Sequence, residues 1–303
     1  MVREHAIVGN GALTSSSLTL LHPKTVTVFL DASPSGKKRA AHAVALARRW
    51  DAHLVGVDVV FTSEALRPCD SYAVGERAIR EVIAHEARIR AHDEAVAHQV
   101  GEQFRDLCSR SDVAWEFRRI GWGQPGEEAM FNALHADLVI VGHPEPHGLP
   151  GGVSLETILL ASGAPLLVVP NAWQGQAIGG NVLIAWNASR QARRAVADAM
   201  IFLVAAEAVT VLIVDPAKRT RHGEEPGADI ALRLARHGAH VNVDRVSSKG
   251  SPIAQVILSY AMQSGSDLLV FGAYSRARLG ERLLGGTTRT LLAQMPIPVL
   301  VSR

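Results

Sequence analysis

Near its start the chain reads Thr25-Val-Thr-Val-Phe-Leu-Asp-Ala-Ser33, and the same pattern returns as Asn181-Val-Leu-Ile-Ala-Trp-Asn-Ala-Ser189. Each stretch is an apolar run with frequent β-branched residues that ends in small polar residues. A run that is apolar on both faces is typical of a strand buried in a parallel sheet. Each is followed by an alanine-rich helical segment, at about 37–49 and about 190–203. The chain therefore carries two copies of one strand–helix unit.

The remainder of the two halves repeats in the same order. The matching segments are 53–60 with 209–215 as second strands, 123–125 with 250–252 before helices, 137–142 with 267–272 as fourth strands, and 159–169 with 291–301 at the end. Strands that alternate with helices pair in parallel through right-handed crossovers. We expect an α/β protein of two tandem doubly wound domains, each a Rossmann-like sheet of five parallel strands in the order 3-2-1-4-5.

The repeat also predicts the division of the chain. We expect an N-terminal extension at 1–24, a first domain at 25–170, a linker at 171–180 and a second domain at 181–303. The halves differ in their second helix, which spans about 72–109 in the first half and about 227–237 in the second.

The composition excludes several classes of protein. Of 303 residues, 48% are hydrophobic and 20% charged, an ordinary globular balance, and the net charge of +2 argues against a dedicated nucleic-acid binder. No apolar run is long enough for a transmembrane helix, so we expect no membrane association. The two cysteines, Cys69 and Cys108, form no CxxC pair and favour a reducing cytoplasm.

Ligands of open α/β sheets bind at the carboxyl ends of strands where the strand order reverses. In this chain that crevice lies after the first strand of each half. Asp31 stands there in the first half. The second half offers Trp186, Asn187 and Ser189, with Asp215 at the end of the neighbouring strand. These side chains would frame a nucleoside.

The loop after the fourth strand of the second half reads Gly272-Ala-Tyr-Ser-Arg-Ala-Arg-Leu-Gly-Glu-Arg-Leu-Leu-Gly-Gly-Thr-Thr-Arg-Thr290. Glycines let a backbone approach an anion closely, and the N-terminus of the following helix favours phosphate. The candidate phosphate-binding residues are Gly272, Ser275, Arg276, Arg278, Gly285, Gly286, Thr287 and Thr288.

This loop resembles the nucleotide loop of the universal stress protein family, Gly-x-x-Gly, nine residues, then Gly-Ser/Thr. Gly272 and Gly285 match two of its glycines, Ser275 replaces the other, and Gly286 stands at the Ser/Thr position. The resemblance covers about 25–303. It implies five-stranded α/β domains, ATP or AMP as ligand in some members, and domains that pair through their last strands.

Intrachain pairing would also cover an otherwise open apolar edge strand, and a further homodimer is left open. Each half departs from the family pattern at one point. Nucleotide-binding members carry an aspartate at the end of the first strand. The first half keeps it as Asp31, but its loop at 142–154 loses the glycine spacing. The second half keeps the loop but has Asn187.

The leading hypothesis is a regulatory protein that binds ATP or AMP in its second domain. A nucleotide-free interaction or scaffold protein is the first alternative, and a weak ATPase or nucleotide-transfer enzyme is the second. The sequence has no GxSxG and no P-loop, and we assign no catalytic residue.

Two further motifs have plainer interpretations. Gly121-Trp-Gly-Gln-Pro-Gly126 matches GxGxxG, but it follows the third strand and includes Pro125, which lacks an N–H, so we interpret it as a turn before a helix. The imidazoles of His143 and His147 flank two prolines that hold the loop extended, so we predict no metal site there.

Overall fold

The computed structural model describes residues 22–59, 76–120, 125–143, 154–175, 177–216, 224–273, 275–278 and 281–303. Most of the predicted N-terminal extension, the GxGxxG turn up to Gln124 and the loop from Pro144 to Val153 lie outside these ranges. The elements of the first half are β1 (Thr25–Leu30), α1 (Pro34–Trp50), β2 (His53–Val59), α2 (Glu76–Arg110), β3 (Trp115–Ile120), α3 (Pro125–Leu134), β4 (Leu138–Gly142), α4 (Leu155–Ser162) and β5 (Leu166–Val169).

The second half repeats this plan and adds a hairpin. Its elements are β6 (Asn181–Ala185), α5 (Arg190–Asp198), α6 (Met200–Ala205), β7 (Ala208–Val214), α7 (Ala228–Arg236), β8 (Val241–Val246), α8 (Ile253–Gln263), β9 (Leu268–Gly272), β10 (Ser275–Arg278), β11 (Glu281–Leu284), α9 (Gly286–Gln294) and β12 (Val299–Ser302).

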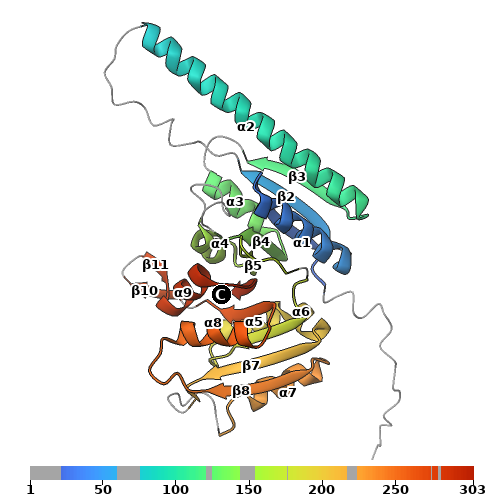
Figure 1. Ribbon diagram of the computed structural model, residues 1–303, viewed down its shortest axis with the longest axis vertical. Helices are drawn as coiled ribbons and strands as arrows, with labels where there is room; N and C mark the ends of the chain where they lie inside the picture. The colour runs from blue at the N-terminus through green and yellow to red at the C-terminus, as the bar shows by residue number, and fades with distance from the viewer. Residues whose placement is uncertain are drawn as a thin grey trace, which may run out of the picture.

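The strands form one sheet in the order β3-β2-β1-β4-β5-β12-β9-β6-β7-β8 (Figure 1). Within each half all neighbours are parallel, and the order 3-2-1-4-5 is confirmed in both. The halves join where β12 pairs antiparallel with β5, with Leu300 opposite Leu167. The expected pairing through the last strands is therefore confirmed within the chain. Because the pairing is antiparallel, the strands of the two halves point in opposite directions.

Helices cover both faces of the sheet, and each face has a core that spans both halves. One core lies under α1, α2, α5, α6 and α7, and the other lies under α3, α4, α8 and α9. In the first core, Trp50 of α1 meets Phe202 of α6 edge to face, with ring centroids 5.1 Å apart. Both rings are fully buried, so the halves share their hydrophobic interior.

In both halves an aspartate just before the fourth strand accepts hydrogen bonds from the backbone at the start of the first strand. Asp137 Oδ2 accepts hydrogen bonds from the backbone N–H groups of Lys24 and Thr25, at 2.8 and 2.9 Å. In the second half, Asp267 accepts from three consecutive backbone N–H groups, those of residues 179–181. Each carboxylate fixes the chain where it enters the first strand of its half. The repeat therefore extends to individual contacts.

Two elements differ from the expected plan. The single helix predicted at about 190–203 is broken at Ala199 into α5 and α6. The long helix α2 extends well beyond the sheet at its N-terminal end (Figure 1). Its last turns are buried at Phe104 and Cys108, whereas Ile83 is 60% exposed. Among the described helices, none has the length and apolar character to cross a membrane.

Candidate functional site

The candidate site of the second half begins where β6 ends. Asn187 Oδ1 accepts a hydrogen bond from Ser189 N–H at 3.2 Å, and Ser189 Oγ accepts one from Ala192 N–H at 3.1 Å. Ser189 is thus the N-cap of α5, and Ala188 between them has a left-handed φ of 53°. This Asx turn holds the Asn187 side chain at the carboxyl end of the strand.

Gly272 lies against the first turn of α5. A Cβ atom on Gly272 would stand 2.1 Å from the carbonyl carbon of Gln191 and 2.3 Å from Ala192 N. Only glycine allows β9 and α5 to approach this closely. The structure therefore places Gly272 beside the Ser189 cap, and it gives this glycine a packing role that does not depend on phosphate.

The helix α9 begins at Gly286, within the Gly285-Gly286-Thr287-Thr288 stretch of the candidate phosphate loop. Gly285 is its N-cap residue and offers no side-chain cap, and the first turn contains no acidic residue. A Cβ atom on Gly286 would meet nothing within 4 Å. Thr287 is exposed, whereas Thr288 is only 4% exposed. Backbone N–H groups and Thr287 are therefore the accessible donors at this end of the helix.

Part of the loop between β9 and α9 forms a β-hairpin, which the sequence analysis did not predict. Ser275, Arg276 and Arg278 belong to β10, which pairs antiparallel with β11. Their side chains lie outside the described part of the structure. Leu284, at the end of β11, is buried in the core of the α3–α4–α8–α9 face, and β11 contacts α4 of the first half. The candidate phosphate loop is thereby anchored on the other half of the molecule.

The structure places two predicted nucleoside residues in supporting positions. The Trp186 side chain packs against the core on the α5–α7 face. Its backbone N–H donates a hydrogen bond to the backbone carbonyl of Leu212 at 2.9 Å. Asp215 accepts hydrogen bonds from Ser248 N–H at 2.8 Å and from Ser248 Oγ at 2.6 Å. Asp215 therefore ties the end of β7 to the turn after β8. Its carboxylate is already used within the protein.

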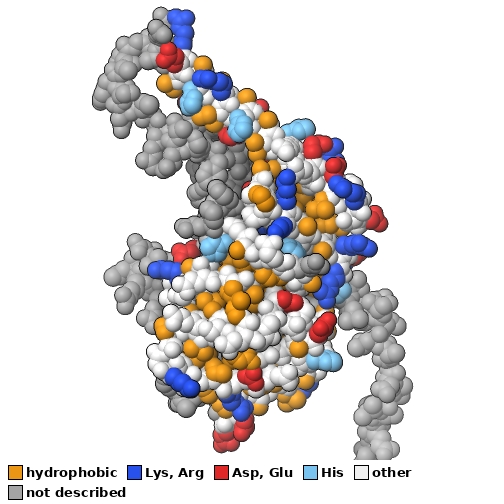
Figure 2. Space-filling model, viewed as in Figure 1, with side chains coloured by type: hydrophobic (Ala, Val, Ile, Leu, Met, Phe, Trp, Pro, Cys, Tyr) orange, Lys and Arg blue, Asp and Glu red, His pale blue; other side chains and the backbone are white. Residues whose placement is uncertain are grey.

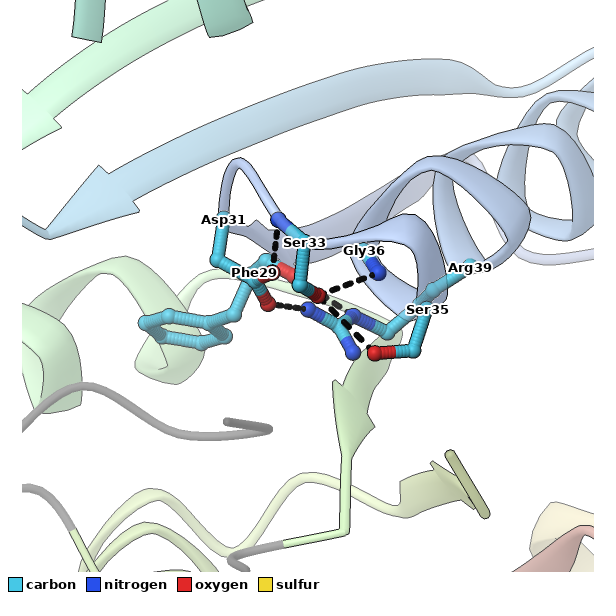
Figure 3. A network of polar contacts seen from close by, with 6 residues as sticks. All are labelled: Phe29, Asp31, Ser33, Ser35, Gly36 and Arg39. Atoms are coloured by element: carbon cyan, nitrogen blue, oxygen red, sulfur yellow. Dashed lines mark hydrogen bonds and ion pairs between the residues drawn. The ribbon is translucent and has the colours of Figure 1, made fainter. Parts of the chain in front are cut away.

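In the first half, the equivalent position holds a charged pair (Figure 3). Asp31 Oδ1 accepts a hydrogen bond from Ser33 N–H at 2.8 Å, and Asp31 Oδ2 pairs with the guanidinium of Arg39. Arg39 is 1% exposed and also donates to Phe29 O at 2.8 Å. Burial lowers the pKa of Arg39, and the Asp31 carboxylate counteracts that effect. Each carboxylate oxygen of Asp31 therefore has a partner within the protein.

The repeat shows that this pair is specific to the first half. Ser33 and Ser189 are the equivalent N-caps, so that Asp31 corresponds to Asn187 and Arg39 corresponds to Ala195. The second half therefore has neither the carboxylate nor the guanidinium at these positions. The sequence interpretation missed Arg39, although it lies three residues after Gly36 on the buried face of α1, where a basic residue is unexpected.

A second carboxylate lies near Asp31. Asp58, in β2, is paired in the sheet with Leu30 and is 7% exposed. Burial raises the pKa of Asp58 to about 6; Arg119 lowers it and Asp31 raises it further. At the carboxyl edge of the first half, the carboxylates of Asp31 and Asp58 therefore lie close enough to Arg39 and Arg119, respectively, to interact with them. Among the described residues, no cluster of three or more His, Cys, Asp or Glu side chains could hold a metal ion.

Comparison with known proteins agrees with this architecture. A sequence model described as "Universal stress protein family" matches residues 180–303. The second half is a universal stress protein domain. A comparison with curated proteins gives no match.

Solved universal stress proteins share the tandem arrangement. One from Archaeoglobus fulgidus DSM 4304 is 14% identical, with a TM-score of 0.64 over 93% of this chain and 98% of its own. A putative universal stress protein from Pseudomonas aeruginosa UCBPP-PA14 is 15% identical, with a TM-score of 0.54 over 93% and 94%. At this identity the likeness concerns the fold alone. It extends the universal stress protein fold over both halves.

Proposed function

We propose that the protein is a regulatory universal-stress-type protein of the cytoplasm that binds one adenine nucleotide, ATP or AMP, in its second half. The observation that carries the proposal is the uncapped start of α9. Gly285 gives this helix no side-chain cap, and its first turn contains no acidic residue. Such a helix end attracts phosphate through its free donors and its dipole.

The crevice at β6 supports the nucleoside part of the proposal. The Asn187 carboxamide is held at the carboxyl end of β6, near Gly272. The position equivalent to Arg39 of the first half is Ala195. Its NH2 group can donate to a ribose or base acceptor. Ser189 and the neighbouring backbone would also contact the nucleoside. Trp186 and Asp215 would stabilise the site through their contacts with the core and with Ser248. Arg276 and Arg278 would add positive charge near the phosphates.

The first half supports the opposite conclusion about its own crevice. Asp31 is the aspartate that the family pattern places at the end of the first strand. Its carboxylate forms an ion pair with Arg39 and accepts a hydrogen bond from Ser33 N–H. A nucleotide donor at Asp31 would compete with the buried guanidinium of Arg39, and separating that pair costs several kcal/mol. We therefore propose that the first half, residues 25–170, is a nucleotide-free domain that completes the sheet.

A second candidate function is a nucleotide-free interaction protein. The observation that favours it is α2, which extends beyond the sheet (Figure 1) and exposes Val82 and Ile83. Hydrophobic side chains also lie on the surface of this projecting part of the molecule in Figure 2. The two functions differ in one measurable respect, which is whether ATP or AMP binds at all.

The test is a calorimetric titration of ATP into the wild type and Gly285→Asp. Gly285 has φ −63° and ψ 152°, which any residue adopts, and aspartate is a good N-cap residue, so the variant should fold. Its carboxylate would occupy the phosphate position, and we expect ATP affinity to fall at least tenfold. The matched control is Ser154→Asp, which adds the same charge at the N-cap of α4. No ATP binding by the wild type, or an equal loss in both variants, would refute the proposal.

A further inference from the structure

A separate cavity of about 430 Å³ lies between the two halves, a volume that suits a small ligand. Its walls come from the ends of α3 and α4 and the approach to β4 in the first half, and from α5 and α6 in the second. None of the candidate nucleotide-binding residues lines it.

Three helices, α3, α4 and α5, end at this cavity and one, α6, begins there; His22 also lines it. The C-terminal ends of α3 and α4, at Leu134 and Ser162, both line it, and neither helix has a basic residue in its last turn. The C-terminus of a helix is its negative end. The one arginine of the lining, Arg194, is paired with Asp198 at 2.8 Å, which leaves that pair neutral. Asp137, which forms no ion pair among the described residues, therefore adds a carboxylate to the negative ends of α3 and α4.

Asp137 also has acceptor capacity that its counterpart lacks. Both of its backbone donors bind Oδ2. Asp267, the equivalent residue, accepts with both carboxylate oxygens. Among the described residues no hydrogen bond reaches Asp137 Oδ1, so this oxygen can accept from a ligand. Apolar surface lies nearby on Leu134, which is 45% exposed, and on Met200 and Ile201.

We propose that this cavity binds an aliphatic amine, with an ammonium group at Asp137 Oδ1 and the ends of α3 and α4, and the methylene chain against Leu134, Met200 and Ile201. An ammonium group donates up to three hydrogen bonds and complements the negative helix ends. The proposal does not depend on nucleotide binding, because the two sites share no residue.

The experiment is a calorimetric titration of the full chain with cadaverine, using 1,5-pentanediol as the neutral ligand of equal length. We expect saturable binding of the diamine and none of the diol. Ser162→Lys should reduce cadaverine affinity at least tenfold, because it places a cation in the cavity, and a lysine at a helix C-terminus favours folding. Ser162→Ala, which removes the same hydroxyl without adding charge, should bind as the wild type does.

A second pair of variants tests the carboxylate. Asp137→Asn should also weaken cadaverine binding at least tenfold, whereas Asp229→Asn, an equal change of charge on the exposed first turn of α7, should leave it unchanged. Thermal melting would establish that each variant is folded. The proposal is wrong if cadaverine does not bind, if the diol binds equally well, or if Ser162→Lys binds cadaverine with wild-type affinity.

Discussion

The Arg39 guanidinium of α1 lies against the Asp31 carboxylate at the end of β1, and the equivalent positions of the second half hold Ala195 and Asn187. This one exchange distinguishes the two crevices. In the first half the two charges neutralise each other, and in the second half the same positions hold a neutral amide and an alanine. The contrast leads to predictions on stability and on binding.

Asp31→Asn should destabilise the protein by about 3 kcal/mol, because it leaves the buried Arg39 without its counter-charge. Urea unfolding would measure the loss. Asp31→Asn/Arg39→Leu should recover part of it, since both charges are then absent, and the cycle gives the coupling energy. If the loss in the double variant equals or exceeds the summed losses of Asp31→Asn and Arg39→Leu, the pair is not coupled as described.

The two parts of the proposed nucleotide site should respond separately. Asn187→Ala should weaken adenosine and ATP by similar factors, because it removes only a nucleoside contact. Gly285→Asp should weaken ATP at least tenfold and leave adenosine unchanged, because its charge acts on phosphate. Competition titrations with both ligands would measure the ratios. Equal losses of both ligands in Gly285→Asp would show that the helix start does not bind phosphate.

Gly272 and Gly286 form a matched pair of glycines with opposite expectations. Gly272→Ala should cost about 2–3 kcal/mol or more, since its Cβ atom would overlap the α5 backbone at 2.1 Å. Gly286→Ala should be neutral or stabilising by up to about 1 kcal/mol, because its Cβ atom meets open space and alanine favours the helix. Thermal and urea unfolding of both variants would decide. A tolerated Gly272→Ala would contradict the described contact between β9 and α5.

Asp58 should make stability depend on pH. Its folded pKa of about 6 exceeds the ordinary value of 3.8, so the folded protein binds the proton more tightly than the unfolded chain. Its contribution is therefore favourable at low pH and is lost as the pH rises through about 6. Asp58→Asn removes this dependence. The stability difference between Asp58→Asn and wild type should grow by about 1.4 kcal/mol between pH 5 and pH 7.5. An unchanged difference would show that Asp58 is not desolvated.

Much of the fold could be predicted from the repeat alone. The apolar runs at 25–33 and 181–189, with their matching later strands, located the strands and indicated the tandem arrangement, because buried parallel strands have a clear pattern of apolar residues. The break at Ala199 and the β10–β11 hairpin were not predicted. Both depend on packing between segments that are distant in sequence, such as β11 against α4.

The candidate site was predictable in its parts but not in its contacts. The helix start at Gly285–Gly286 and the turn at Asn187 lie where their motifs indicate. Asp215 and Gly272 have structural partners that only the folded chain brings together, namely Ser248 and the start of α5. The pairing of Asp31 with Arg39 joins a strand end to the second turn of a helix. The domain boundaries that we expect remain a prediction.

The central claim is that one half of this molecule binds nucleotide and the other half does not. Equilibrium dialysis of the full chain against labelled ATP and labelled AMP, at saturating ligand, measures this stoichiometry directly. We predict one bound adenine nucleotide per chain. Two per chain would contradict the proposal that the Asp31–Arg39 pair keeps nucleotide out of the first half, and none would contradict the proposed site at Asn187 and Gly285.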